Sequence, residues 1–171
     1  MGCYDELKAI VGRDQPDMVA TDTVCSQMIR HWCEAMEDAN PLYTDPEYAD
    51  KCKYGSIIAP PTMIWSWVIP PLWPPTEPPK IWEEILRACA HGGFDQIVDT
   101  DVEMEFHRPL RPGDRVTAAA RLYDVSEEKH TSLGRGHFVT VESAYRNQKN
   151  EPVCLQRVTL FIYDAGADDA V

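Results

Sequence analysis

The sequence predicts an α+β domain in which an antiparallel sheet wraps around a buried central helix. Three observations lead to this prediction. An almost continuous apolar stretch lies at 57–68, a proline-rich connection follows at 70–79, and the chain beyond residue 97 reads as strands. Helical patterning that gives way to strand patterning is typical of folds that pack helices on one face of an antiparallel sheet. The helix at 57–68 is therefore expected to cover the apolar face of the sheet.

The composition fits one domain over residues 1–171. Of the 171 residues, 44% are hydrophobic and 26% are charged, which supports one ordinary core but not two. A net charge of −12 argues against nucleic acid or an anionic membrane surface as the main partner. The longest apolar stretch is interrupted by prolines and is too short to cross a bilayer. The six cysteines lack metal-site spacing, so we expect reduced thiols, no metal site and a cytoplasmic protein.

Helical patterning dominates the first half of the chain. Apolar residues recur at helical spacing over 24–38, and this helix must end before Pro41 because a residue that precedes proline disfavours helix. The proline pair at 60–61 suits the first turn of the buried helix, where missing N–H groups have no helical partner. Prolines stiffen the connection at 70–79, and an amphipathic helix is predicted over 81–90.

Four strands are predicted in the second half. The first, 98–107, alternates apolar and acidic residues, so its apolar side chains are expected to face the core. The other three cover 115–125, 138–145 and 153–163, with polar or glycine- and proline-containing turns between them. In chain order they predict a long meander, followed by an acidic tail at 164–171 that is expected to fray.

Three motifs, in order along the chain, carry a family resemblance. They are Ala-Met-Glu-Asp-Ala-Asn-Pro-Leu-Tyr-Thr-Asp at 35–45, Gly-Ser-Ile-Ile-Ala-Pro-Pro-Thr at 55–62 and Arg-Pro-Leu-Arg-Pro-Gly-Asp at 108–114. Together they resemble the MaoC-type hot-dog proteins, which include R-specific 2-enoyl-CoA hydratases and the dehydratase domains of fatty-acid synthases. The resemblance implies a hot-dog fold whose central helix begins at the second motif. It also implies hydration of a carbon–carbon double bond next to a thioester.

The catalytic positions of the family are only partly filled. In family members an Asp and a His hold the water, and a glycine N–H at the start of the central helix polarises the thioester carbonyl. The Asp matches Asp38, but the His position is Tyr43 and the glycine position is Pro61. A phenol titrates near pH ~10 and is a poor proton shuttle at pH 7, and proline has no N–H. We therefore expect no competent active site in this chain alone.

The departures themselves follow a pattern. Asn-Pro-Leu-Tyr followed by Ile-Ala-Pro-Pro-Thr resembles the N-terminal-dehydratase branch of the family, whose members pair with a second hot-dog domain that keeps Asp and His. The resemblance implies a non-catalytic, tunnel-forming subunit of a heteromeric 2-enoyl-CoA hydratase. Its substrate would be a bulky acyl-CoA, such as a steroid side-chain thioester. No metal or redox cofactor is implied, and coenzyme A enters only as part of the substrate.

Candidate binding residues fall into two groups. Those expected near the acyl group are Asn40, Tyr43, Trp65, Trp67 and Trp73. Those expected near the phosphates of coenzyme A are Arg108, Arg111 and Arg135. The plainer alternatives are core packing for the tryptophans, a solvated surface for the arginines and a helix-end turn for Asp38.

Two other functions remain open. The chain could be a self-sufficient hydratase, or a hot-dog thioesterase, that uses Asp38. It could instead be an acyl-CoA-binding or scaffold homodimer that catalyses no reaction. Turnover by the purified chain separates these alternatives from a support subunit.

Overall fold

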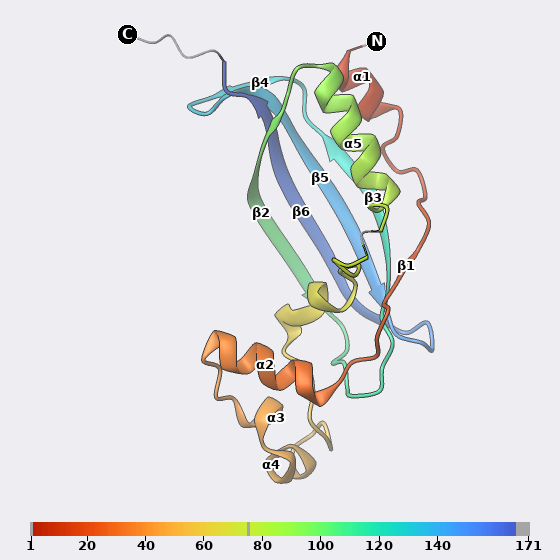
Figure 1. The fold of residues 1–171 in the computed structure, drawn as a ribbon, viewed down its shortest axis with the longest axis vertical. Helices are drawn as coiled ribbons and strands as arrows, with labels where there is room; N and C mark the ends of the chain where they lie inside the picture. Colours follow the sequence, from red (N-terminus) through yellow and green to blue (C-terminus); the bar gives the residue numbers. More distant parts are fainter. Residues whose placement is uncertain (1, 75, 167–171) are drawn as a thin grey trace.

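The computed structural model describes residues 2–74 and 76–166, which form one antiparallel sheet with helices on one face (Figure 1). The strand order is β1-β3-β5-β6-β2, and β4 pairs with β5 as a hairpin off this path. The strands are β1 (Met18–Val19), β2 (Gln96–Phe106), β3 (Thr117–Val125), β4 (Lys129–Thr131), β5 (Gly134–Arg146) and β6 (Pro152–Asp164). The four predicted strands are thus present, and the pairs β3–β5 and β5–β6 follow the predicted meander.

The meander prediction is wrong for β2. This strand precedes β3 in the chain, yet it crosses to the opposite edge and pairs with β6. The free side of β3 is occupied by β1 instead. Hydrophobic alternation identifies a strand but not its neighbour, because the choice depends on which edge the rest of the chain leaves open.

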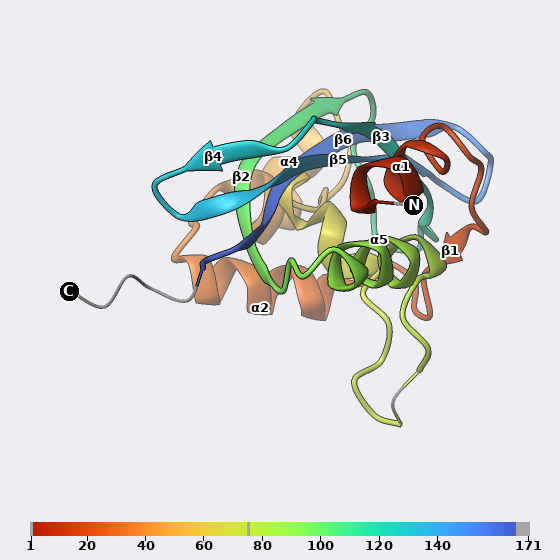
Figure 2. The ribbon, with the colours of Figure 1, turned by 90° about the horizontal axis from the view of Figure 1, so that it is seen from above.

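Helices cover one face of this sheet. They are α1 (Cys3–Lys8), α2 (Ser26–Met36), α3 (Pro41–Thr44), α4 (Pro46–Lys51), the 3₁₀ helix η1 (Pro61–Trp67) and α5 (Lys80–His91). Figure 2 shows α2 and α5 on the same side of the curved sheet, while the connection between η1 and α5 extends away from it. The predicted helices at 24–38 and 81–90 correspond to α2 and α5. The short elements α1, β1 and β4 were not predicted.

The cover of the sheet is divided between η1, within the predicted helix at 57–68, and α5, which spans the predicted amphipathic helix at 81–90. One core cluster joins η1 to the ends of the long strands through residues such as Met63, Ile64 and Tyr145. The other joins α5 to the middle of the sheet through residues such as Ile85 and Leu122. The segment at 57–68 forms only seven residues of 3₁₀ helix, because two prolines at its start supply no N–H groups and Pro70 follows closely.

Strand β2 also departs from its predicted alternation. A bulge between Asp99 and Asp101 shifts the register, so that Val98 pairs with Phe161 while Val102 pairs with Val158. Phe161 and Val158 lie on opposite faces of β6, hence Val98 and Val102 also face opposite ways. The prediction that every apolar residue of this strand faces the core is therefore wrong.

The predicted tail begins later than residue 164. Asp164 is the last residue of β6, and its carboxylate lies 3.1 Å from the guanidinium of Arg135. The rest of the predicted tail, at 167–171, lies outside the described residues.

Candidate functional site

The three sequence motifs meet at one end of the sheet. The amide N–H of Ile58 donates to the carbonyl oxygen of Leu42 (3.2 Å), and that of Ala59 donates to the carbonyl of Leu110 (2.9 Å). The second motif is therefore held between the first and the third. This junction lies at the C-terminal end of β2, near α2, α3 and α4 (Figure 1).

A pocket of about 310 Å³ opens at the junction. Much of its wall is apolar and includes Ile58, Pro61, Ile64, Phe106 and Val153. Lys53, His107 and Arg108 also line it, so basic groups and an apolar wall share one space. Neither Asp38 nor Tyr43 lines this pocket.

The basic residues of the pocket have different surroundings. The guanidinium of Arg108 lies 3.1 Å from the carboxylate of Glu151 and is half-exposed. The ammonium of Lys53 lies 4.9 Å from the ring centre of Tyr54. Arg111 does not line the pocket but donates to the carbonyl oxygen of Tyr54 (3.0 Å) and to the hydroxyl of Ser56 (3.2 Å). Arg111 therefore stabilises the pocket wall through its hydrogen bond to Tyr54, which lines the pocket.

Asp38 and Asn40 are engaged in shaping the chain. Glu37 ends α2 in the left-handed region at φ 53°, and the N–H of Asp38 then donates to the carbonyl of Cys33 (2.9 Å). The carboxylate of Asp38 accepts from the N–H of Asn40 (3.0 Å). The side-chain oxygen of Asn40 in turn caps α3 by accepting from the N–H of Leu42 (3.1 Å). Both side chains thus bind local backbone N–H groups.

Tyr43 cannot replace an imidazole here. Its side chain is half-buried against the first core cluster. Burial, followed by the nearby carboxylate of Asp38, raises the pKa of the phenol above its ordinary value. The phenol therefore keeps its proton at pH 7. At the start of η1, Pro60 and Pro61 both lack the N–H that would polarise a carbonyl.

Comparison with known proteins decides the family. Residues 9–156 match the family described as "FAS1-like, dehydratase domain region". The chain belongs to this family. Within it, the chain is 39% identical over 155 residues to a probable enoyl-CoA hydratase alpha subunit from Thermomonospora curvata, which covers 88% of the chain and 49% of that protein.

A second curated relative and a solved structure agree with this assignment. A 3-oxo-4,17-pregnadiene-20-carboxyl-CoA hydratase alpha subunit from Mycobacterium tuberculosis is 35% identical over 134 residues, covering 78% of the chain and 42% of that protein. The chain thus spans about half the length of these two curated relatives. The crystal structure of the ChsH1-ChsH2 complex from M. tuberculosis superposes with a TM-score of 0.89 at 28% identity, covering 98% of this chain and 94% of that one. The fold is the MaoC-like hot-dog fold.

The tryptophans predicted near the acyl group do not gather in one site. Trp67 is buried in the first core cluster, and its indole N–H has no hydrogen-bond partner among the described residues. Trp65 is partly exposed, and Trp73 is 84% exposed in the connection between η1 and α5. Their role in binding stays a prediction.

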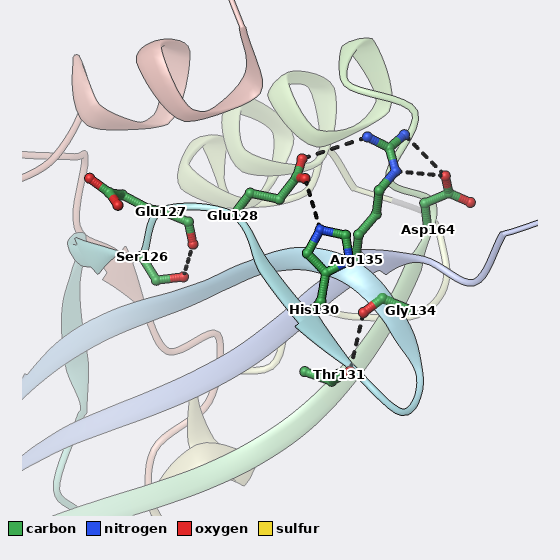
Figure 3. Close-up of polar contacts among 8 residues, drawn as sticks. All are labelled: Ser126, Glu127, Glu128, His130, Thr131, Gly134, Arg135 and Asp164. Atoms are coloured by element: carbon green, nitrogen blue, oxygen red, sulfur yellow. Dashed lines mark hydrogen bonds and ion pairs between the residues drawn. The ribbon is translucent and has the colours of Figure 1, made fainter.

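Arg135 lies apart from Arg108 and Arg111. It belongs to β5 beside the β4 hairpin, where its guanidinium reaches the carboxylates of Glu128 (3.6 Å) and Asp164 (3.1 Å). Figure 3 shows Glu128 between Arg135 and His130 in this cluster. Both Arg108 and Arg135 have carboxylate partners, but only Arg108 lines the pocket at the motif junction.

Sequence reasoning missed Lys53, Phe106 and His107 as pocket residues. Phe106 and His107 end the predicted strand directly before the third motif, and Lys53 lies two residues before the start of the second, so closeness to the motifs was the available signal. Within 2–74 and 76–166 no group of three His, Cys, Asp or Glu side chains is placed to hold a metal ion. None of the helices described there is long and apolar enough to traverse a bilayer.

Proposed function

We propose that this chain is the non-catalytic, tunnel-forming subunit of a heteromeric 2-enoyl-CoA hydratase. One observation carries the proposal: the wall of the pocket at the motif junction contains Pro61, which has no N–H to donate, and contains neither Asp38 nor Tyr43. A second MaoC-like hot-dog subunit would supply Asp and His. The reaction would add water across the α,β double bond of a bulky acyl-CoA, such as a steroid side-chain thioester, and needs no metal or redox cofactor.

The chemistry of the pocket supports an acyl-CoA substrate. An apolar wall suits an acyl chain, while Lys53 and Arg108 suit the phosphates of coenzyme A. Its volume of about 310 Å³ is at the lower end of the ~300–1,000 Å³ typical of small-molecule sites. A bulky acyl-CoA therefore needs more room than this chain encloses, which favours a tunnel completed by a partner.

The edge of the sheet supports the partner. On its outer side β2 has no strand neighbour among the described residues. An unpaired strand edge binds other strands readily. The alpha-subunit names of the two curated relatives support a heteromer over a homodimer. A coenzyme A thioester substrate is consistent with a cytoplasmic location.

The test is turnover by the chain alone and by the chain with a partner. The probe substrates are crotonyl-CoA and a steroidal enoyl-CoA. The candidate partner is a hot-dog protein of the same genome that carries Asn-Pro-Leu-His with an Asp two residues before the Asn, as Asp38 precedes Asn40 here. We expect hydration only by the mixture, with Asp38→Ala leaving that activity largely unchanged. Hydration by the purified chain alone that disappears in Asp38→Ala contradicts the proposal.

The same experiment separates the alternatives. Release of free coenzyme A by the chain alone identifies a thioesterase. A native mass equal to two copies of the chain, with no activity in the presence of the partner, supports the scaffold homodimer.

A further inference from the structure

The N-terminal helix α1 packs on α5 and on β3. Only Cys3 and Leu7 of α1 are buried, and the segment from 9 to 17 that follows has no regular secondary structure. One polar contact joins Glu6 to His91, at 3.4 Å and largely exposed. Tyr4 stacks on His137, and Lys8 lies 3.8 Å from Asp124, so these non-covalent contacts hold α1 on the domain.

Two buried thiols meet at this contact. The sulfur of Cys3 lies 3.8 Å from the sulfur of Cys89 on α5, in hydrogen-bonding contact. No other pair of cysteines in the described chain forms a thiol–thiol hydrogen bond. Gly92 makes this approach possible, because a Cβ at that position would lie 2.7 Å from the Cβ of Cys3.

Access to the pair is one-sided. A shallow hollow of about 460 Å³ is lined by Cys3 together with Tyr4, Gly92 and His137, but not by Cys89. Arg135 also lines the hollow, yet Glu128 and Asp164 neutralise it. A small neutral molecule is thus favoured over an anion, and it reaches the sulfur of Cys3 first.

We propose that Cys3 and Cys89 are an oxidisable pair that closes to a disulfide when a peroxide enters this hollow. Cys3 as thiolate attacks one oxygen of the peroxide, the O–O bond breaks, and Cys3 becomes a sulfenic acid while hydroxide leaves and takes up a proton as water. The sulfur of Cys89 then attacks the sulfenic sulfur, and a second water leaves with the proton of Cys89. Two thiols are oxidised by two electrons, and one peroxide is reduced to two waters.

The thiol pair itself favours this order of events. The hydrogen bond between the two thiols lowers the pKa of Cys3, and the same contact together with burial raises the pKa of Cys89. Cys3 is therefore the more readily ionised of the two thiols, which assigns attack on the peroxide to Cys3 and the resolving step to Cys89. The product ties α1 covalently to the C-terminal half of α5, so α1 can no longer detach from the domain.

The experiment uses the full chain, reduced and then exposed to hydrogen peroxide at one equivalent per chain. After alkylation and non-reducing digestion, we expect a Cys3–Cys89 linked peptide, two fewer alkylated thiols and an intact mass lower by two hydrogen atoms. The oxidised form is expected to have a higher Tm, and dithiothreitol is expected to reverse each change. A disulfide elsewhere, a disulfide between chains, or a full set of free thiols overturns the proposal.

Variants assign the roles. In Cys89→Ser the sulfenic acid of Cys3 is expected to persist and to be trapped by dimedone, while Cys3→Ser gives neither the adduct nor the linked peptide. Cys25→Ser is the matched control, because Cys25 is partly exposed but not hydrogen-bonded to another thiol, and it is expected to form the same Cys3–Cys89 link as the unmodified chain. Oxidation of Cys25 ahead of Cys3 contradicts the assignment.

Discussion

The two edges of the sheet are finished in different ways. On the β3 side the chain closes its own edge, since β1 pairs there and the N–H of Gly12 donates to the carbonyl of Leu122 (2.8 Å). On the β2 side eleven residues run along the edge, none of them is buried, and no described strand pairs with their outer side. Exposed strand edges are normally covered or blunted. The difference teaches that this domain closes one edge of its sheet itself and leaves the backbone of β2 open at the other, within the described residues.

The side chains of the two edges follow the same division. Leu122 and Val116, in β3 and just before it, are fully buried. Ile97, Val102 and Phe106 of β2 are 49%, 50% and 43% exposed, although they are apolar and face the helix side of the sheet. The buried apolar side chains of β3 belong to the core of this chain. The exposed apolar side chains of β2 form the kind of surface that is typical of interaction sites.

The largest expected effect comes from truncating one apolar residue at each edge. Leu122→Ala should lower the free energy of unfolding by about 2–5 kcal/mol, because it leaves a cavity in the core. Val102→Ala should change it by about 0.5 kcal/mol or less, because the side chain is already half in solvent. Urea unfolding of the isolated chain measures both values. Equal losses in the two variants contradict the contrast between the edges.

A charge placed on each edge tests association directly. Val102→Glu should weaken binding to the partner by about 30-fold or more, since a central interface residue contributes about 2 kcal/mol or more. Val19→Glu is the control, because Val19 of β1 is 58% exposed at the other edge. Titration calorimetry with the partner measures both affinities. A loss of affinity in Val19→Glu, with none in Val102→Glu, would place the interface at the β1 edge and contradict the prediction.

An ion network joins the three neighbouring strands β3, β5 and β6. The carboxylate of Glu142 on β5 lies 2.6 Å from Arg121 of β3 and 2.8 Å from Arg157 of β6. Glu142→Gln should destabilise the chain by about 1–3 kcal/mol at pH 7, because hydrogen bonds to a charged group are lost. Thermal or urea unfolding at several pH values measures the difference.

The sign of the pH dependence follows from Glu142. Burial alone would raise its pKa, but the hydrogen bonds from Arg157 and Arg121 lower it below the ordinary value. A carboxylate with a lowered folded pKa adds stability above its unfolded pKa of ~4.3, and this is lost as pH falls through the folded pKa. The difference between the unmodified chain and Glu142→Gln should therefore shrink below pH ~4. A difference that grows on acidification contradicts this assignment.

The smallest expected effect concerns the pocket at the end of β2. Arg108→Ala should raise the KM of the complex for an acyl-CoA by about 10-fold, because a charge-assisted contact to phosphate is lost. Arg135→Ala should leave KM unchanged, because Arg135 lies beside the β4 hairpin and does not line this pocket. A rise in KM only for Arg135→Ala would move the phosphate site to the other end of the sheet.

The sequence predicted the helices and strands better than it predicted which strands pair with one another. Local patterns sufficed for α2, α5 and the long strands, because each depends on residues close together in the chain. The pairing of β2 with β6 and the bulge at Asp99 depend on which edge remains free, and that is decided only in the assembled sheet. The short helix α1 buries only Cys3 and Leu7, and one pair at helical spacing is too little to predict a helix from the sequence.

The candidate site was predictable only in part, because local motifs name residues but do not show how those residues are arranged in space. The motifs singled out Asp38, Tyr43 and Pro61. They also indicated that two of these positions differ from the His and Gly of the family. They did not indicate that Pro61 lines the pocket while Asp38 and Tyr43 lie outside it, nor that Arg135 lies at the β4 hairpin. Distances between residues far apart in the chain are set by the fold and have no local signature.

The decisive measurement is kcat for the assembled complex after one catalytic position is removed from each subunit in turn. If the partner carries the chemistry, replacing its motif His by Ala should lower kcat by about 100-fold or more, since that is the usual contribution of a general acid–base group. Asp38→Ala in this chain should then change kcat by less than about 3-fold, because Asp38 binds only a local backbone N–H. A large loss from Asp38→Ala, with little from the partner variant, would place the reaction in this chain.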